Sequence, residues 1–116
     1  MHHRISLKSI LPETGKPPAQ QLTLFALLTL GILESLANGL LSGTEALQVF
    51  FHTENCQFVR KQLHDKIADQ IMSHSVQLAD LFDALPTAEA HREFQRELAA
   101  MRTLCLKLLE EKQLVA

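Results

Sequence analysis

The residues best suited to chemistry in this chain of 116 residues are a few carboxylates and histidines within a largely apolar sequence. Glu34 is the most interesting of them, because it follows an almost wholly apolar run from Leu22 to Leu33. This position predicts a carboxylate that is partly drawn into the protein interior, where it must find donors or stay protonated. Asn38, one helical turn later, is its expected neighbour. The pair could anchor a ligand in a pocket, or Glu34 could simply be a structural acid near a helix end.

His74 is the base that could complete such a pocket, since it falls on the apolar stripe of a later helical segment. No serine or cysteine nucleophile stands at a recognisable spacing from any of the histidines. We therefore expect surface or interface histidines, no catalytic residue and no enzymatic activity. Glu34, Asn38, His74 and Asp80 remain weak candidates for binding.

His52 and Cys56 stand four residues apart, a separation that could direct both toward one metal ion in a continuous helix. They straddle a predicted helix break, however, and the sequence has no Cys-x-x-Cys or His-x-x-His pair and no Glu-x-x-His signature of a di-iron bundle. Cys56 and Cys105 lie in apolar stripes and are expected to be buried free thiols in a reducing compartment. We expect no metal, no cofactor and a cytoplasmic location.

The element that positions Glu34 is a helix over residues 19–38 that is apolar on nearly all sides. Such a helix is either a central core helix or a membrane span. Extending the apolar run to the roughly 20 residues of a span would include Glu34 and Asn38. We therefore favour the core helix and expect no membrane partner.

The end of this helix and the start of the next are marked by local signals. Gly39 can adopt the left-handed conformation that closes a helix. Ser42 and Glu45 have the spacing of a capping box, in which each side chain binds the backbone amide of the other. Gly39, Ser42 and Glu45 are therefore structural, and a second helix is expected over residues 43–52.

This junction also resembles part of a known family. The resemblance is carried by Leu33-Glu34-Ser35-Leu36, Asn38-Gly39, Leu41-Ser42, Glu45-Ala46 and Phe50-Phe51. These residues resemble the opening block of a family of short bacterial all-helical proteins of unknown function. Gln77-Leu78-Ala79-Asp80-Leu81 is similar to its later leucine–aspartate segment, although Ala79 stands where the family usually has Glu. The resemblance covers about residues 25–109 and implies a helical fold but no activity.

The rest of the chain predicts two further helical segments. Asn55 is the expected cap of a long apolar stripe that runs from residue 56 to residue 85. A bend is expected near residues 73–75, where three weak helix formers follow one another. Pro86 ends this segment, and Thr87 can cap the last helix.

The composition favours an all-α fold. Hydrophobic residues make up 47% of the chain, and only 4 Gly and 4 Pro are present, which leaves few turns for an all-β fold. We predict a small bundle of four main helices with the nearly all-apolar first helix at its centre. Residues 21–116 would form the bundle domain. Residues 1–20 would form a loosely ordered N-terminal arm, or an extended segment lying across the bundle or a neighbouring subunit.

The charge balance and apolar content bear on function. A net charge of −2 argues against a nucleic-acid binder, whose only support would be the cluster of Arg60, Lys61 and Lys66. The leading hypothesis is a non-enzymatic protein–protein interaction module, specifically of an inhibitor or immunity type. The leucine content exceeds what one small bundle can bury, so a homodimer is expected. The alternative is a small-ligand-binding or catalytic pocket near Glu34 and Asn38.

Overall fold

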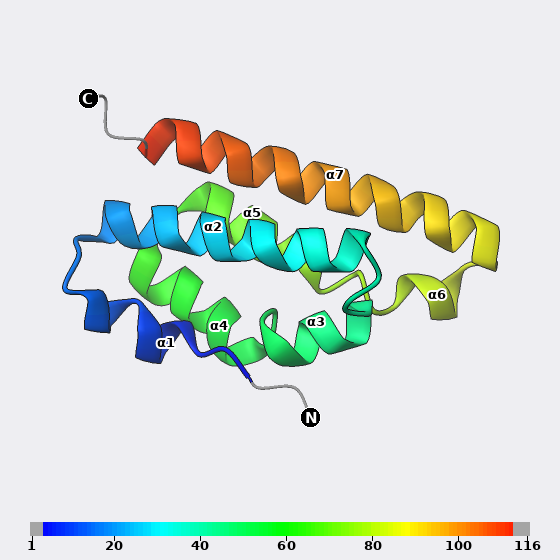
Figure 1. Cartoon of the computed structure of the whole chain (residues 1–116), viewed down its shortest axis with the longest axis horizontal. Coiled ribbons are helices and arrows are strands. Elements are labelled where there is room, and N and C mark those ends of the chain that lie inside the picture. Colours follow the sequence, from blue (N-terminus) through cyan, green and yellow to red (C-terminus); the bar gives the residue numbers. More distant parts are fainter. Residues whose placement is uncertain (1–3, 113–116) are drawn as a thin grey trace.

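The computed structural model describes residues 4–112, apart from the side chains of residues 82, 83 and 112, and its regular structure is entirely helical (Figure 1). Helices make up 77% of the molecule, and no strand occurs in the part of the chain that is described. The all-α fold class is therefore confirmed. The bundle of four main helices is not confirmed, because residues 43–84 are divided among several short helices.

Two long helices, α2 (Pro18–Ala37) and α7 (Thr87–Lys112), lie side by side and run in opposite directions (Figure 1). Proline is well tolerated in the first turn of a helix, which explains the start of α2. Gly39 follows its end with a φ of +73°, as predicted for a left-handed closing residue. The predicted first helix is thus confirmed to within one residue at each end.

Shorter helices make up the rest of the molecule. In chain order they are α1 (Leu7–Ile10), η1 (Pro12–Thr14), α3 (Gly43–Val49), α4 (Thr53–Phe58), η2 (Val59–Leu63), α5 (Lys66–Ser75) and α6 (Leu81–Ala84). In Figure 1, α1, α3 and α4 lie below α2, whereas α7 lies above it. Helix α5 packs against α7, and α3 and η2 contact α2. The short helices therefore cover the inner side of the α2–α7 pair.

The predicted helical stripe from residue 56 to residue 85, with one bend near residues 73–75, contains a further break that was not predicted. The chain breaks at His64, which has a left-handed φ of +49°, and Asp65 then caps α5 by accepting the amides of Ile67 and Ala68 at 2.9 and 3.0 Å. The apolar spacing conceals this break because Leu63 and Ile67 are buried on either side of it. The second break was anticipated, since α5 ends at Ser75.

The predicted cap at Asn55 is also wrong. His52 precedes α4, and its Nδ1 accepts the amide of Asn55 at 3.4 Å. The second helix correspondingly ends at Val49 rather than at His52. Asn55 is instead fully buried, with its side chain directed to other segments.

Part of the predicted N-terminal arm, residues 5–11, packs against the bundle, whereas residues 12–19 are exposed. Leu7 and Leu11 are one helical turn apart and have no exposed surface. The amide of Ile5 donates to the carbonyl of Val49 at 2.8 Å, and the amide of Leu7 donates to Asn55 Oδ1 at 3.0 Å. The segment is too short for a helical period to be visible in the sequence, so only the packing identifies it as part of the core.

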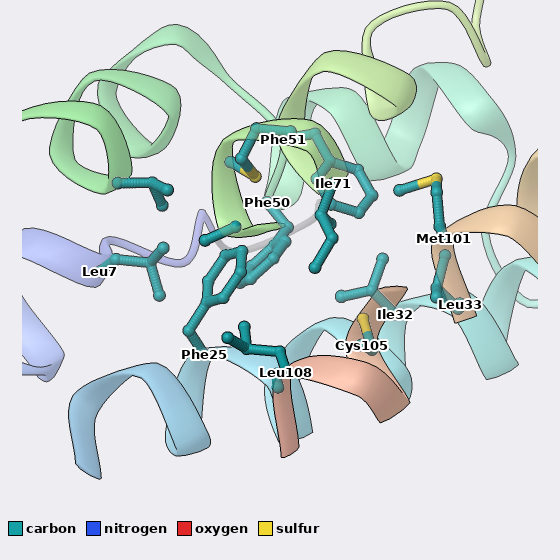
Figure 2. Packing of buried hydrophobic residues seen from close by; sticks show 14 of the residues in the cluster. Leu7, Phe25, Ile32, Leu33, Phe50, Phe51, Ile71, Met101, Cys105 and Leu108 are labelled. Atoms are coloured by element: carbon teal, nitrogen blue, oxygen red, sulfur yellow. The ribbon is translucent and has the colours of Figure 1, made fainter. Parts of the chain in front are cut away.

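The buried cluster joins residues from both ends of the chain (Figure 2). Phe50 stacks on Phe25 with ring centroids 6.2 Å apart and meets the edge of Phe51 at 5.1 Å. Figure 2 shows Leu7, Ile71 and Leu108 around these rings. Aromatic pairs of this geometry add to the burial of apolar area, so this cluster is the centre of the fold.

The predicted capping box is confirmed. Ser42 Oγ accepts the amide of Glu45 at 3.0 Å, and Glu45 Oε1 accepts the amide of Ser42 at 2.9 Å. Gly43 has a further role that the sequence did not reveal. A Cβ at this position would lie 3.0 Å from the carbonyl oxygen of Leu78, so glycine lets α3 pack directly on the turn after α5.

Helix α2 has the length and apolar composition that could cross a membrane, with a mean hydropathy of 1.4 over its most apolar window. Within the molecule, 39% of that window is buried. Its buried residues form one stripe toward the core, namely Leu22, Phe25, Ala26, Thr29, Ile32, Leu33 and Leu36. Leu24, Leu28 and Leu30 are partly buried against the same core, whereas Leu27 is 52% exposed.

Candidate functional site

A groove of about 500 Å³ runs between α2 and α7. Its lining residues are Leu30, Gly31, Leu33, Glu34, Ala37, Gln95, Leu98, Ala99, Arg102 and Leu106. Leu33 and Leu98 are buried, whereas Gly31 and Ala99 are exposed. Because Gly31 and Ala99 have little or no side chain, the groove can accommodate a flat or helical surface.

Glu34 lies at this groove but is exposed, which corrects the expectation that its side chain enters the bundle. The buried stripe of α2 passes through Ile32, Leu33 and Leu36, so the side chain of residue 34 points away from the core. Asn38 Nδ2 donates to Glu34 Oε1 at 2.9 Å and to the Glu34 carbonyl at 2.8 Å. The predicted pairing of Glu34 with Asn38 therefore exists, and it also satisfies a carbonyl at the helix end.

His74 does not join Glu34. Its Nδ1 lies 2.7 Å from Glu97 Oε2, in a contact that links α5 to α7. It lines a separate hollow of about 820 Å³ between those helices, together with His64, Lys66 and Thr103. The pocket that would combine Glu34 with His74 is therefore not formed, because the two side chains line different cavities.

Asp80 is exposed and immediately precedes the four-residue helix α6. Its amide donates to the carbonyl of Gln77 at 3.2 Å in the preceding turn. Its place in the fold is thus a turn outside the α2–α7 groove.

A cleft of about 620 Å³ lies between α3, α4 and α5. Phe51, Met72 and Val76 supply apolar lining, and Cys56 and Arg60 lie at the same cleft. Burial raises the pKa of the Cys56 thiol, while the charge of Arg60 opposes this rise. The thiol is therefore a poor nucleophile at neutral pH.

His52 also lines this cleft, but its ring has a structural role. Its Nε2 lies 2.9 Å from the carbonyl of Ile5, and its Nδ1 lies 3.1 Å from the Arg4 guanidinium. Cys56 Sγ, for its part, lies 3.8 Å from the Phe51 carbonyl. Among the described residues, no group of three His, Cys, Asp or Glu side chains could hold a metal ion.

Sequence reasoning missed Arg102, Leu27 and Leu106. Leu27 and Leu106 are 52% and 45% exposed, although each belongs to a leucine-rich helix whose other leucines largely face the core. The available signal was their phase: Arg102 and Leu106 lie off the buried stripe of Leu98, Met101, Cys105 and Leu108. Only the position of α7 beside α2 shows that Arg102 and Leu106 share a groove with Glu34.

Comparison with known proteins finds no matching family model, no matching curated protein and no matching solved structure. The resemblance to short bacterial helical proteins is therefore still a prediction.

Proposed function

We propose that this chain is a non-enzymatic protein–protein interaction module that binds a helical partner along the face formed by α2 and α7. The observation that supports this function is a pair of helical stripes along the groove and its edge, where Gly31, Ala99 and Leu106 line the groove and Leu27 lies one turn before Gly31 on α2. Each stripe combines an exposed leucine (Leu27 or Leu106) with a small residue (Gly31 or Ala99). Exposed apolar surface rimmed by polar groups is typical of protein interaction sites, and a groove between two helices suits a third helix.

The distribution of the polar candidates favours binding over catalysis. Glu34 is hydrogen-bonded to Asn38, and His74 is paired with Glu97 on another part of α7. A general acid and base must reach the same reacting group, and these residues lie at different cavities. A bacterial cytoplasmic inhibitor or immunity-type protein is the specific form of this function that we propose, given the small size and slight acidity of the chain.

The test is affinity capture with three forms of the purified protein: wild type, the double variant Leu27→Asp/Leu106→Asp, and Val76→Asp. Val76 is 46% exposed and lines the other cleft, so it is a matched apolar-to-acid control. We expect wild type and Val76→Asp to retain the same stoichiometric partner, whether another protein or a second copy, and the double variant to lose it. A partner retained equally by all three forms would contradict the proposed face.

A second candidate function is small-ligand binding in the α3–α4–α5 cleft. It is favoured by the apolar lining from Phe51 and Met72, with Arg60 and Asp69 at the same cleft, which suits an apolar molecule with a polar group. In the same experiment this function predicts a small molecule that co-purifies with wild type and with the double variant, but not with Val76→Asp. Mass spectrometry of the three preparations separates the two functions.

A further inference from the structure

We infer that the occupant of the α2–α7 face is a second copy of this chain, in a dimer in which α2 of each copy packs on α7 of the other. This inference rests on the proposed function, because it names the partner of the same surface. The feature that supports it is the distribution of charge on the face.

The groove contains one acidic and one basic side chain, Glu34 on α2 and Arg102 on α7. Both are exposed. Among the described residues, neither forms an ion pair within its own chain. The Asn38 amide holds Oε1 of Glu34, which fixes the orientation of the carboxylate at the groove. The face thus carries an oriented acceptor on one helix and a charged donor on the other.

Each of the two helices carries an exposed leucine. On α2, Leu27 precedes Gly31 by one turn, and on α7, Leu106 follows Arg102 by one turn. The helices α2 and α7 are antiparallel (Figure 1), so these opposite positions in sequence put the two leucines toward the same end of the helix pair. Glu34 lies on the opposite side of Gly31 from Leu27, toward the C-terminal end of α2.

A twofold axis along the groove exchanges the two helices, so that α2 lies on the partner's α7 and α7 lies on the partner's α2. Leu27 then covers the partner's Leu106, and Glu34 lies within reach of the partner's Arg102. In a twofold dimer each such contact occurs twice. The exposed small residues Gly31 and Ala99 allow the helices of the two copies to approach closely. A face with one charge sign would repel its own copy, whereas this face is complementary to itself.

The test measures the dimer dissociation constant by sedimentation equilibrium for wild type, Glu34→Arg, Arg102→Glu and the control Lys61→Glu. Lys61 is exposed and lies in η2, outside the groove. Each groove variant places like charges opposite each other twice, so we expect its dissociation constant to rise at least about tenfold. Lys61→Glu should match wild type. Circular dichroism melting curves check that all four proteins fold alike, since every substituted residue is exposed.

The decisive step is to mix Glu34→Arg with Arg102→Glu. The arginine introduced at position 34 of one chain would face the glutamate introduced at position 102 of the other. The unchanged Arg102 and Glu34 would still pair, so the mixture should form a heterodimer about as tightly as wild type.

A monomeric wild-type chain, or a mixture that remains monomeric, would overturn the inference. If the wild-type chain is monomeric but the capture experiment still yields a face-dependent partner, the proposed function stands with a different occupant. If the face captures nothing and the chain does not dimerise, both fail.

Discussion

Asn55 is a buried residue whose side chain connects three segments of the chain. Its Oδ1 accepts the amide of Leu7 at 3.0 Å, and its Nδ2 donates to the carbonyls of Phe50 and Ile5 at 2.7 and 2.9 Å. No solvent reaches this amide, since the residue has no exposed surface. The side chain therefore replaces water for backbone groups that no helix satisfies.

We predict that Asn55→Ala lowers the free energy of unfolding by about 3 kcal/mol, because the buried Leu7 amide and Phe50 carbonyl each lose a partner. Asn38→Ala is the matched control, since Asn38 is exposed and its loss should cost about 1 kcal/mol or less. Urea unfolding of both variants provides the comparison. Equal losses of unfolding free energy in the two variants would show that burial of the Asn55 amide does not add to stability.

Cys105 gives the stability of the protein a dependence on alkaline pH. Burial raises the pKa of its thiol from 9.0 to about 12. Above pH 9 the unfolded chain releases this proton, whereas the folded protein retains it until about pH 12. Rising pH therefore favours unfolding in this range, and the contribution of Cys105 to stability is fully present only below about pH 9.

Above about pH 9 we expect the free energy of unfolding to fall more steeply in wild type than in Cys105→Ala, with the difference in slope approaching about 1.4 kcal/mol per pH unit near pH 10.5. The comparison of slopes removes the packing loss caused by the substitution, which is the same at each pH. Urea titrations at several pH values across this range supply both slopes. Parallel slopes in the two proteins would contradict a buried, protonated thiol.

Among the elements, the α2–α3 junction is encoded by local residues, but tertiary packing limits which residue can stand at position 43. Its capping box forms between residues three apart in the chain, so the sequence alone predicts where α3 begins. Gly43, inside that box, faces the backbone of Leu78 from a distant turn. The identity of residue 43 is thus decided by the approach of α3 to the chain after α5.

This contact leads to an opposite expectation from helix propensity. Alanine is a better helix former than glycine by about 1 kcal/mol, so an open site would be stabilised by Gly43→Ala. We predict instead a loss of about 1–3 kcal/mol, because the added methyl group would press on the rigid carbonyl of Leu78. Thr44→Ala, at an exposed neighbour, should change stability by no more than about 0.5 kcal/mol. Thermal and urea unfolding distinguish the two signs.

In the molecule as a whole, the N-terminal residues complete the core. Leu7 packs within the same cluster as Phe50 and Ile71 (Figure 2). Because this cluster joins residues far apart in the sequence, the loss of one part should weaken all of it. Helix α1 is therefore part of the cooperative unit.

We predict that Leu7→Ala lowers the free energy of unfolding by about 2–5 kcal/mol, as large-to-small changes in cores do. Ile10→Ala in the same short helix is the control, because Ile10 is 43% exposed and its truncation should cost about 0.5 kcal/mol or less. Urea unfolding followed by circular dichroism measures both. If Leu7→Ala behaves like Ile10→Ala, the N-terminal segment does not contribute to the stability of the core.

Local signals in the sequence were sufficient to predict the all-α class, both ends of α2 and the start of α3. The end of α2 and the start of α3 depend on interactions within a few residues, namely the left-handed Gly39 and the reciprocal bonds of Ser42 and Glu45. The start of α2 follows from the change from a polar, proline-bearing segment to an apolar run. The same local reasoning identified the Glu34–Asn38 pair, whose members are one helical turn apart.

Tertiary packing, by contrast, determines which apolar residues are buried and which polar residues meet. Leu11 and Leu27 are the same residue type, yet the first has no exposed surface and the second is 52% exposed. The break at His64 is hidden by an apolar spacing that continues across it, and the pairing of His74 with Glu97 joins residues 23 positions apart. Likewise, Glu34 and Arg102 share one groove because α7 lies beside α2. Contacts at such separations depend on how helices pack, and a helical period specifies the phase of each helix but not its neighbour.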